Sequence, residues 1–269
     1  ENKNKLNSIQ NDIIRETLKI IKIKRPLYVS SISDIPSNSG LGSSSAFTVG
    51  LIKALYEFEN KKISNIEAAE LACKIEIERV KSPIGKQDQY ATAIGGFNSL
   101  HFNKNSKVSI KKIKKEKVIK NIFENSVFIW LGTTRKTNKI LKDQNKRLNK
   151  NIESLEFIKN FAIKLCLEIK QNKFSINKFG NLIDKSWQLK KRLSKKIENN
   201  KIMKLYDSAI QCGSLGGKLL GAGGGGFLFF VVKKKNIPSF KKKISLKYKK
   251  IKFVDFNYYK KGSEILISQ

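Results

Sequence analysis

The sequence predicts an α+β fold in two parts. Helical spacing of apolar residues recurs along most of the 269-residue chain, two strand-like segments lie near its middle, and strand-like segments return near its end. The length suits one large domain or two modest ones, and a hydrophobic fraction of 40% is enough to form a core. We place the boundary after a lysine-rich stretch, which divides the chain into domains of residues 1–124 and 125–269.

The first part begins with a helical pattern. Apolar residues have roughly helical spacing over residues 6–21, and Pro26 follows them. Residues 27–33 (LYVSSIS) predict a strand. A loop rich in glycine and serine occupies residues 34–45, and a second helical pattern runs from about residue 46 to residue 59.

A capping box opens the next helix. Ser64 stands three residues before Glu67, and this spacing predicts a helix that continues to about residue 79. A short helix is expected over residues 86–94, where a pair of glycines ends it. Two paired strands are expected to follow, at residues 97–102 and 108–113.

The second part is mostly helical and ends in strands. A strand is expected over residues 127–131, and helical patterns then run over residues 137–212 with breaks near Asn149, Asn172 and Asn199. Further strands are expected at residues 218–220, 227–232 and 250–259. The longest apolar run has six residues, whereas a membrane-spanning helix needs about 20. No transmembrane segment is therefore predicted.

The charge first suggests a nucleic-acid-binding protein. Lysine and arginine total 55 against 22 acidic residues, which gives a net charge of +33, and such an excess can neutralise phosphates. Only six of these 55 residues are arginine, the residue that best recognises guanine edges, and the lysines are spread through all predicted elements. We therefore interpret the charge as a compositional bias and expect no specific nucleic-acid partner and no membrane partner. A polyanion-binding function is kept as an alternative.

The rare residues favour a cytoplasmic protein. Cys73, Cys166 and Cys212 lie far apart and form no metal-binding pair, which is typical of reduced thiols. His101 lies in a predicted strand and is interpreted as structural. The chain begins with glutamate and its only methionine is Met203, so we expect that it lacks its true start.

Glycine gives the sharpest functional signal. Five of the 17 glycines lie within residues 221–226 (GAGGGG), between two strand-like segments, and a plain hairpin does not need so flexible a run. Residues 40–45 (GLGSSS) lie between a predicted strand and a helix, where unpaired N–H groups and the helix dipole favour an anion. Neither a Walker A nor a Rossmann pattern is present. Both loops are candidates for close approach of the backbone to a ligand.

A third group of polar residues surrounds one aspartate. Asp88 follows a helix break and is flanked by two amides and by Lys86, so its carboxylate could accept a proton from a hydroxyl group. Glu76 and Glu78 precede it in the predicted helix. Either glutamate could reach a metal ion together with Ser44, and either could equally lie on a solvated helix face.

Three segments together resemble the GHMP kinase family. They are PSNSGLGSSSA (residues 36–46), KQDQYATAIGGFN (residues 86–98) and KLLGAGGGGFLFF (residues 218–230), and they occur in the family's order. The resemblance implies an α+β, two-domain GHMP-kinase-like fold with a truncated N-terminal part and a C-terminal ferredoxin-like α/β sandwich. Within the family the chain most resembles the D-glycero-D-manno-heptose 7-phosphate kinases, and fucokinase- or galactokinase-like sugar 1-kinases are the alternative.

This resemblance also implies a role for each matching position. ATP phosphates would bind Pro36, Gly40, Leu41, Gly42, Ser43, Ser44 and Ser45. Mg²⁺ would be held by Ser44 and Glu76, and Asp88 would be the catalytic base. The cleft would be lined by Gly223, Gly224 and Gly225, and the substrate would contact Lys86, Gln89, Thr134 and Arg135.

The implied reaction is ATP-dependent phosphorylation of a sugar. The acceptor would be the anomeric hydroxyl group of D-glycero-D-manno-heptose 7-phosphate, and the 1,7-bisphosphate would feed the synthesis of nucleotide-activated heptose. The implied partners are ATP, Mg²⁺ and a sugar phosphate, with a homodimer as a possible assembly.

Overall fold

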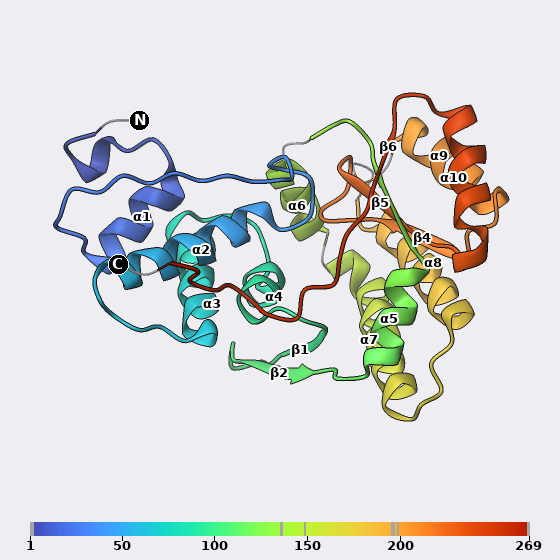
Figure 1. Ribbon diagram of the computed structural model, residues 1–269, viewed down its shortest axis with the longest axis horizontal. Coiled ribbons are helices and arrows are strands. Elements are labelled where there is room, and N and C mark those ends of the chain that lie inside the picture. The colour runs from blue at the N-terminus through green and yellow to red at the C-terminus, as the bar shows by residue number, and fades with distance from the viewer. Residues whose placement is uncertain (1–2, 135–136, 148, 195–196, 198, 268–269) are drawn as a thin grey trace. The chain divides into compact units, whose positions relative to one another are not determined.

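The computed structural model describes residues 3–134, 137–147, 149–194, 197 and 199–267 (Figure 1). The chain forms two compact units. The first unit contains residues up to 37, residues 42–113 and the chain from residue 259, and the second contains residues 38–41 and 114–258. The two-domain division at residue 124 stays a prediction, and this position is the end of a helix in the second unit.

Helices and one hairpin build the first unit. Its elements are η1 (Leu6–Ser8), α1 (Asp12–Ile21), α2 (Ser43–Phe58), α3 (Asn65–Cys73), the π-helix η2 (Lys74–Arg79), α4 (Gln87–Ile94), β1 (Asn98–Phe102) and β2 (Val108–Lys112). The two strands pair in antiparallel register, as expected. Three buried alanines of α3 pack with α2 and α4 around a core that includes Val49, Ile52 and Tyr90. Small side chains on α3 allow these helices to approach closely.

Local signals explain where these helices begin. The side chain of Ser64 accepts a hydrogen bond from the Glu67 backbone N–H, and the Glu67 side chain accepts one from the Ser64 N–H. The predicted capping box is therefore confirmed. The helix expected over residues 6–21 is interrupted, because Asn11 adopts an extended conformation and caps α1 through the Ile14 N–H.

The strand expected over residues 27–33 is wrong. These residues form no strand, and Tyr28 and Ile32 are 92% and 95% exposed. A strand needs a hydrogen-bonded neighbour, and no described segment pairs with this one. Alternating apolar residues alone therefore do not create a strand here.

The end of the chain packs against α4 within the first unit. The N–H of Gly96 donates to the Tyr259 carbonyl oxygen over 3.0 Å, and the N–H of Ser263 donates to the Ala93 carbonyl over 3.3 Å. A side chain at Gly262 would overlap the Ala93 carbonyl group. Glycine at this crossing lets two backbones touch, which fixes the helix that carries Asp88.

The second unit is a four-stranded antiparallel sheet with helices. Its elements are α5 (Glu116–Glu124), β3 (Ser126–Trp130), α6 (Thr137–Lys146), η3 (Asn149–Asn151), α7 (Ile152–Lys170), α8 (Ile176–Arg192), α9 (Asn200–Gln211), β4 (Gly216–Leu219), β5 (Phe227–Val231), η4 (Lys234–Asn236), α10 (Ile237–Lys247) and β6 (Lys252–Val254). The strand order is β4-β5-β3-β6. In the central pair, Ser126 faces Val231 and Trp130 faces Phe227.

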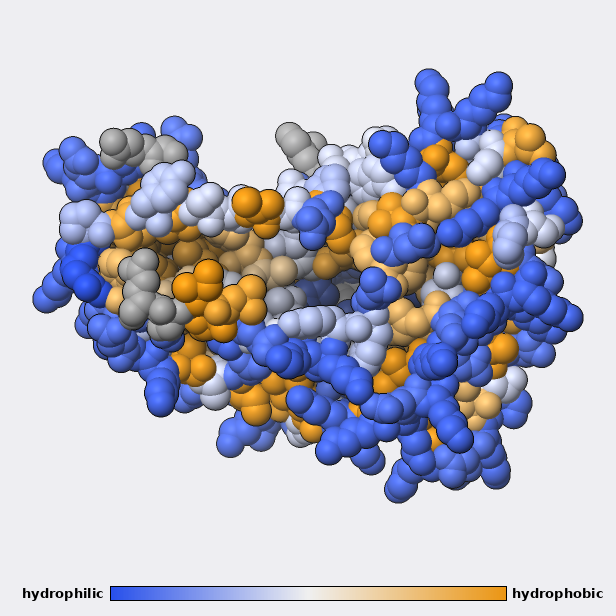
Figure 2. All heavy atoms as spheres, in the orientation of Figure 1, coloured by the Kyte–Doolittle hydropathy of each residue, from blue (hydrophilic) through white to orange (hydrophobic). Residues whose placement is uncertain are grey.

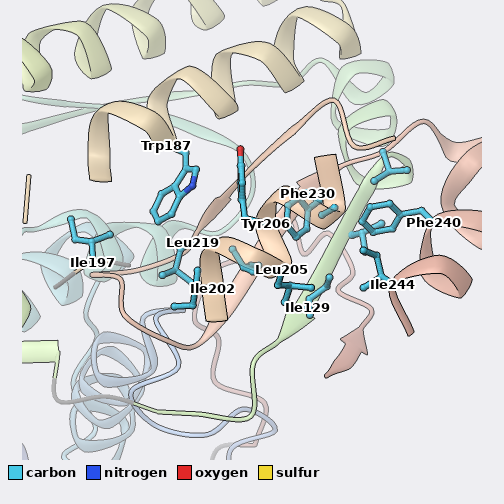
Figure 3. Packing of buried hydrophobic residues seen from close by; sticks show 14 of the residues in the cluster. Ile129, Trp187, Ile197, Ile202, Leu205, Tyr206, Leu219, Phe230, Phe240 and Ile244 are labelled. Atoms are coloured by element: carbon cyan, nitrogen blue, oxygen red, sulfur yellow. The ribbon is translucent and has the colours of Figure 1, made fainter. Parts of the chain in front are cut away.

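One core holds the second unit together. Trp187 of α8, Tyr206 of α9 and Phe230 of β5 are almost fully buried and point toward one another (Figure 3). Phe240 and Ile244 join them from α10, a helix that the sequence did not predict. Their spacing of four residues places both side chains on one helix face, and burial of this face stabilises a lysine-rich segment with weak amphipathic character.

One face of the molecule shows how hydrophilic and hydrophobic side chains are distributed. On the face shown in Figure 2, hydrophilic side chains are spread over both units and are interrupted by hydrophobic groups. Within the described residues, no helix combines the length and the apolar character that crossing a membrane requires. His101 is exposed on β1.

Candidate active site

The N-terminus of α2 lies in the first unit and gathers backbone N–H groups and serine hydroxyl groups. Gly42 precedes the helix with φ of +74°, a left-handed conformation that favours glycine. The Ser43 and Ser44 side chains follow in the first helical turn, and Ser43 Oγ donates to the Pro36 carbonyl over 3.5 Å. The first N–H groups of a 16-residue helix have no helical partner, and the helix dipole is positive there. This corner can therefore bind an anion.

Glu76 lies beneath this helix end. Its Oε1 accepts a hydrogen bond from Ser44 Oγ over 2.5 Å, and its Oε2 accepts one from Gln89 Nε2 over 2.7 Å. Glu76 is only 1% exposed, whereas Glu78 is exposed. The π-helix η2 carries both residues, and such wide turns are frequent at functional sites. The structure thus brings Glu76 to Ser44.

The Ser44–Glu76 pair fits a magnesium ion by its donor chemistry. Within the described part of the chain, no three His, Cys, Asp or Glu side chains form a metal cluster. Mg²⁺ does not need one, because it is commonly held by one or two protein oxygen ligands together with phosphate oxygens and water. A hydroxyl oxygen and a carboxylate oxygen 2.5 Å apart suit that arrangement.

Asp88 lies in the first turn of α4, close to the same corner. A side chain added at Gly42 would stand 3.2 Å from the Asp88 Cβ and Cγ atoms. Burial, and then the negative charge of Glu76, raises the pKa of the Asp88 carboxyl group. A buried carboxyl group with a raised pKa is suited to exchange a proton with a hydroxyl group.

Two other predicted substrate residues of the first unit have partners within the protein. Gln89 is fully buried, and its amide orients Glu76 through the hydrogen bond already described. Its Oε1 has no hydrogen-bond partner among the described residues. Lys86 is the residue before α4, and its ammonium group donates to the Ser106 carbonyl over 2.9 Å.

The glycine-rich loop of residues 221–226 lies in the second unit, against residues 39 and 40. A side chain at Gly40 would stand 3.0 Å from the Leu220 carbonyl oxygen, and one at Gly221 would overlap the Gly40 backbone. A side chain at Gly226 would overlap the Ser39 carbonyl oxygen. Glycine at positions 221 and 226 is therefore required by contact between two backbone segments, each of which carries a predicted ligand-binding motif.

Residues that the sequence did not single out hold this glycine loop in place. The Lys190 ammonium group of α8 donates to the Gly221 carbonyl and, over 3.3 Å, to the Leu219 carbonyl. Gln144 of α6 donates to the Ala222 carbonyl over 3.2 Å. No spacing rule could have revealed these contacts, because the partners lie 31 and 78 residues apart in the sequence.

The far end of the loop is anchored by main-chain groups. Gly226 donates its N–H to the Thr133 carbonyl over 3.0 Å, and Gly224 donates to the Ile197 carbonyl over 2.6 Å. Thr134, a predicted substrate residue, is exposed next to this anchor. Arg135, the predicted phosphate clamp, lies outside the described residues.

Comparison with known families accounts for both halves of this arrangement. The model of the GHMP kinases N terminal domain matches residues 8–96, and the GHMP kinases C terminal model matches residues 162–250. A solved Campylobacter jejuni protein assigned to the sugar kinases is 31% identical, with 97% of this chain and 75% of that chain covered and a TM-score of 0.72. The chain belongs to the GHMP kinase family.

Two curated relatives are kinases whose names give different substrates. D-glycero-alpha-D-manno-heptose 7-phosphate kinase of Campylobacter jejuni is 34% identical over 221 residues, which cover 80% of this chain and 63% of the relative. Mevalonate kinase of Methanocaldococcus jannaschii is 30% identical over 213 residues, which cover 78% of this chain and 64% of the relative. The chain thus spans somewhat less than two thirds of the length of either relative.

The family match covers the corner at the N-terminus of α2 and the glycine loop. Ser44, Glu76 and Asp88 lie within the segment that matches the GHMP kinase N-terminal model, and the glycine loop lies within the segment that matches the C-terminal model. The expected GHMP kinase fold, α+β and in two parts, is confirmed.

Proposed function

We propose that this GHMP kinase transfers the γ-phosphoryl group of ATP to the anomeric hydroxyl group of D-glycero-D-manno-heptose 7-phosphate. The observation that carries the proposal is the corner formed by Ser44, Glu76 and Asp88 at the N-terminus of a glycine-flanked helix. The choice of sugar is supported by the 34% identity to a heptose 7-phosphate kinase. Free thiols and the use of ATP favour the cytoplasm as its location.

The phosphate-binding step is assigned to the loop of residues 36–45. Pro36, Gly40 and Leu41 shape the backbone that leads to Gly42, and the N–H groups after Gly42 bind phosphate oxygens at the helix end. The serine hydroxyl groups at positions 43–45 supply further polar contacts, although Ser45 itself is 3% exposed. Ser44 and Glu76 would hold Mg²⁺, which neutralises charge on the transferred phosphoryl group.

Asp88 acts as the base in this proposal. The anomeric hydroxyl group attacks the γ-phosphorus while its proton passes to the Asp88 carboxylate, and the bond from the γ-phosphorus to the β,γ-bridging oxygen breaks, so that ADP leaves with that oxygen. The raised pKa of Asp88 makes its carboxylate a better proton acceptor than that of an exposed aspartate. Phosphoryl transfer needs little more than such in-line placement and neutralised oxygens.

Sugar recognition is assigned to residues from both matched segments. Lys86, Gln89 and Thr134 are the proposed substrate residues, with Gln89 acting through its hydrogen bond to Glu76. Arg135 is the proposed partner of the 7-phosphate, because a guanidinium group matches phosphate geometry. The glycines at 223–225 are proposed to line the nucleotide and substrate site.

A substrate screen tests the proposal. Coupled measurement of ADP release with heptose 7-phosphate, fucose, galactose and mevalonate should give the highest kcat/KM with the heptose phosphate. A preference for a free sugar would support a fucokinase- or galactokinase-like enzyme, and a preference for mevalonate would follow the second curated relative. If none of these compounds supports ATP turnover and the protein shows salt-sensitive RNA binding, the polyanion-binding alternative is favoured instead.

A matched pair of variants tests the metal assignment. Glu76→Gln removes the buried carboxylate beside Ser44, while Glu78→Gln changes an exposed residue two positions away. We expect Glu76→Gln to raise the Mg²⁺ concentration for half-maximal activity by about tenfold or more and Glu78→Gln to leave it unchanged. The opposite ranking would contradict the assignment of Glu76.

A further inference from the structure

The carbonyl groups at the start of the glycine loop accept hydrogen bonds from side chains of the second unit. The Gly221 carbonyl accepts from Lys190 and the Ala222 carbonyl accepts from Gln144. These donors come from two different helices, α8 and α6, which flank the loop. The loop is therefore fixed from outside its own sequence.

Capture of a carbonyl group also fixes the direction of the next N–H group. In a trans peptide the C=O and the following N–H point in opposite directions, and the described residues contain no cis peptide bond. Lys190 therefore turns the Ala222 N–H away from α8, and Gln144 turns the Gly223 N–H away from α6. Within the described part of the chain, neither N–H group has a hydrogen-bond acceptor. Successive free N–H groups of this kind form an anion-binding concavity.

Lys190 donates to main-chain carbonyl groups at this position, and no ion pair of Lys190 is found among the residues that the structure describes. Its only hydrogen-bond acceptors among the described residues are the two carbonyl oxygens at the end of β4 and the start of the loop. Burial, and then the charge of Lys218 on β4, lowers the pKa of Lys190 to about 7. Burial of a cation is costly, and hydrogen bonds to the two carbonyl oxygens offset part of that cost. Both its charged and its neutral form still carry hydrogens to donate.

We propose that Lys190 is a positioning residue for the reaction. It holds the Leu219 and Gly221 carbonyls so that the first N–H groups of the loop are presented to a phosphate group of the bound nucleotide or sugar phosphate. This inference rests on the proposed kinase function for its ligand, but the effect of Lys190 on the loop does not depend on that function. Gln144 assists at the next carbonyl.

Three variants of α8 test the proposal. Lys190→Met removes the donor and keeps the length of the side chain, and Lys190→Arg keeps a donor. Lys185→Met is the matched control, because Lys185 is an exposed residue of the same helix. For each protein, deuterium uptake of the peptide around residues 219–227 is measured together with kcat and with KM for ATP and for the sugar phosphate.

We expect Lys190→Met to exchange the loop amides about tenfold faster and to raise KM for one phosphate-bearing substrate by about tenfold, the effect of one charge-assisted hydrogen bond. The substrate whose KM rises identifies which phosphate the loop faces. Lys190→Arg should stay within about threefold of the parent, and Lys185→Met should match the parent. Loop exchange and KM values in Lys190→Met equal to those in Lys185→Met would overturn the proposal.

Two further outcomes are informative. If Lys190→Met does not fold, Lys190→Arg decides, because an arginine variant that folds but exchanges its loop much faster than the parent contradicts the positioning role. If the parent phosphorylates no sugar, the proposed function fails, while the exchange comparison still tests whether Lys190 fixes the loop.

Discussion

The two candidate ligand-binding regions achieve order by different means. At the N-terminus of α2 the candidate functional groups are side chains, and one of them, Glu76, is held by the side chains of Ser44 and Gln89. At the glycine loop of the second unit, the candidate ligand-binding groups belong to the backbone. Contact of Gly221 and Gly226 with residues 39 and 40 leaves no room for a side chain at these two positions. We therefore expect the first region to be sensitive to the loss of a functional group, and the second region to the addition of any side-chain atom.

The largest effect is expected at Asp88. Asp88→Asn keeps the shape of the side chain but cannot accept a proton, so kcat should fall by about 10²–10⁴ while the Kd for ATP changes little. Asp207→Asn, a change at an exposed residue of α9, should leave kcat at the parent value. Steady-state kinetics and calorimetric ATP binding measure both quantities. Unchanged turnover in Asp88→Asn would refute its role as the base.

A gain of one methyl group should have the next largest effect. Gly226→Ala places a Cβ against the Ser39 carbonyl at a φ of +91°, so we expect a loss of about 2 kcal/mol or more in unfolding free energy. Gly50→Ala is the control, because a Cβ there meets nothing within 4 Å and alanine favours the helix by up to about 1 kcal/mol. Urea unfolding of both variants gives the comparison. Equal stability of the two proteins would contradict the close contact.

Gln89 donates to Glu76, so its loss should change the Mg²⁺ requirement no more than the loss of the Glu76 carboxylate does. Gln89→Leu removes the amide that donates to Glu76 Oε2 and leaves a buried carboxylate oxygen without its partner. We expect a rise of about tenfold in the Mg²⁺ concentration needed for half-maximal activity, with KM for the sugar changed less. Were the sugar KM to rise and the Mg²⁺ requirement to stay constant, Gln89 would be a direct substrate contact instead.

The features that could be predicted from the sequence are those that depend on residues close to one another along the chain. The capping box at Ser64, the paired strands β1 and β2, and the glycines of the loop at 221–226 all follow from short-range rules. Residues 27–33 have strand-like alternation but no pairing partner, and α10 depends on burial of Phe240 and Ile244 in a distant core. Lys190 and Gln144 could not be found either, because their acceptors lie far along the chain.

The last prediction is a slope of stability with pH. The folded pKa of Lys190 is about 7 against an ordinary value of 10.5, so above pH 7 the folded chain releases a proton that the unfolded chain retains. The free energy of unfolding contributed by this residue should therefore rise with pH, from about 7 toward 10. Urea unfolding of the parent and of Lys190→Met at pH 7 and pH 8.5 isolates this slope. A parent curve parallel to that of the variant would contradict burial of the charge.

The central claim is that Asp88 is the base in the transfer of the γ-phosphoryl group of ATP to a sugar phosphate. Phosphorus NMR of a reaction with ATP, Mg²⁺ and heptose 7-phosphate tests it most directly, because it distinguishes a phosphate at the anomeric carbon from free phosphate. We predict an anomeric phosphate signal that grows with ADP in the parent and is absent over the same time in Asp88→Asn. Formation of ADP and free phosphate without a sugar bisphosphate, or an equal anomeric signal in both proteins, would contradict the account.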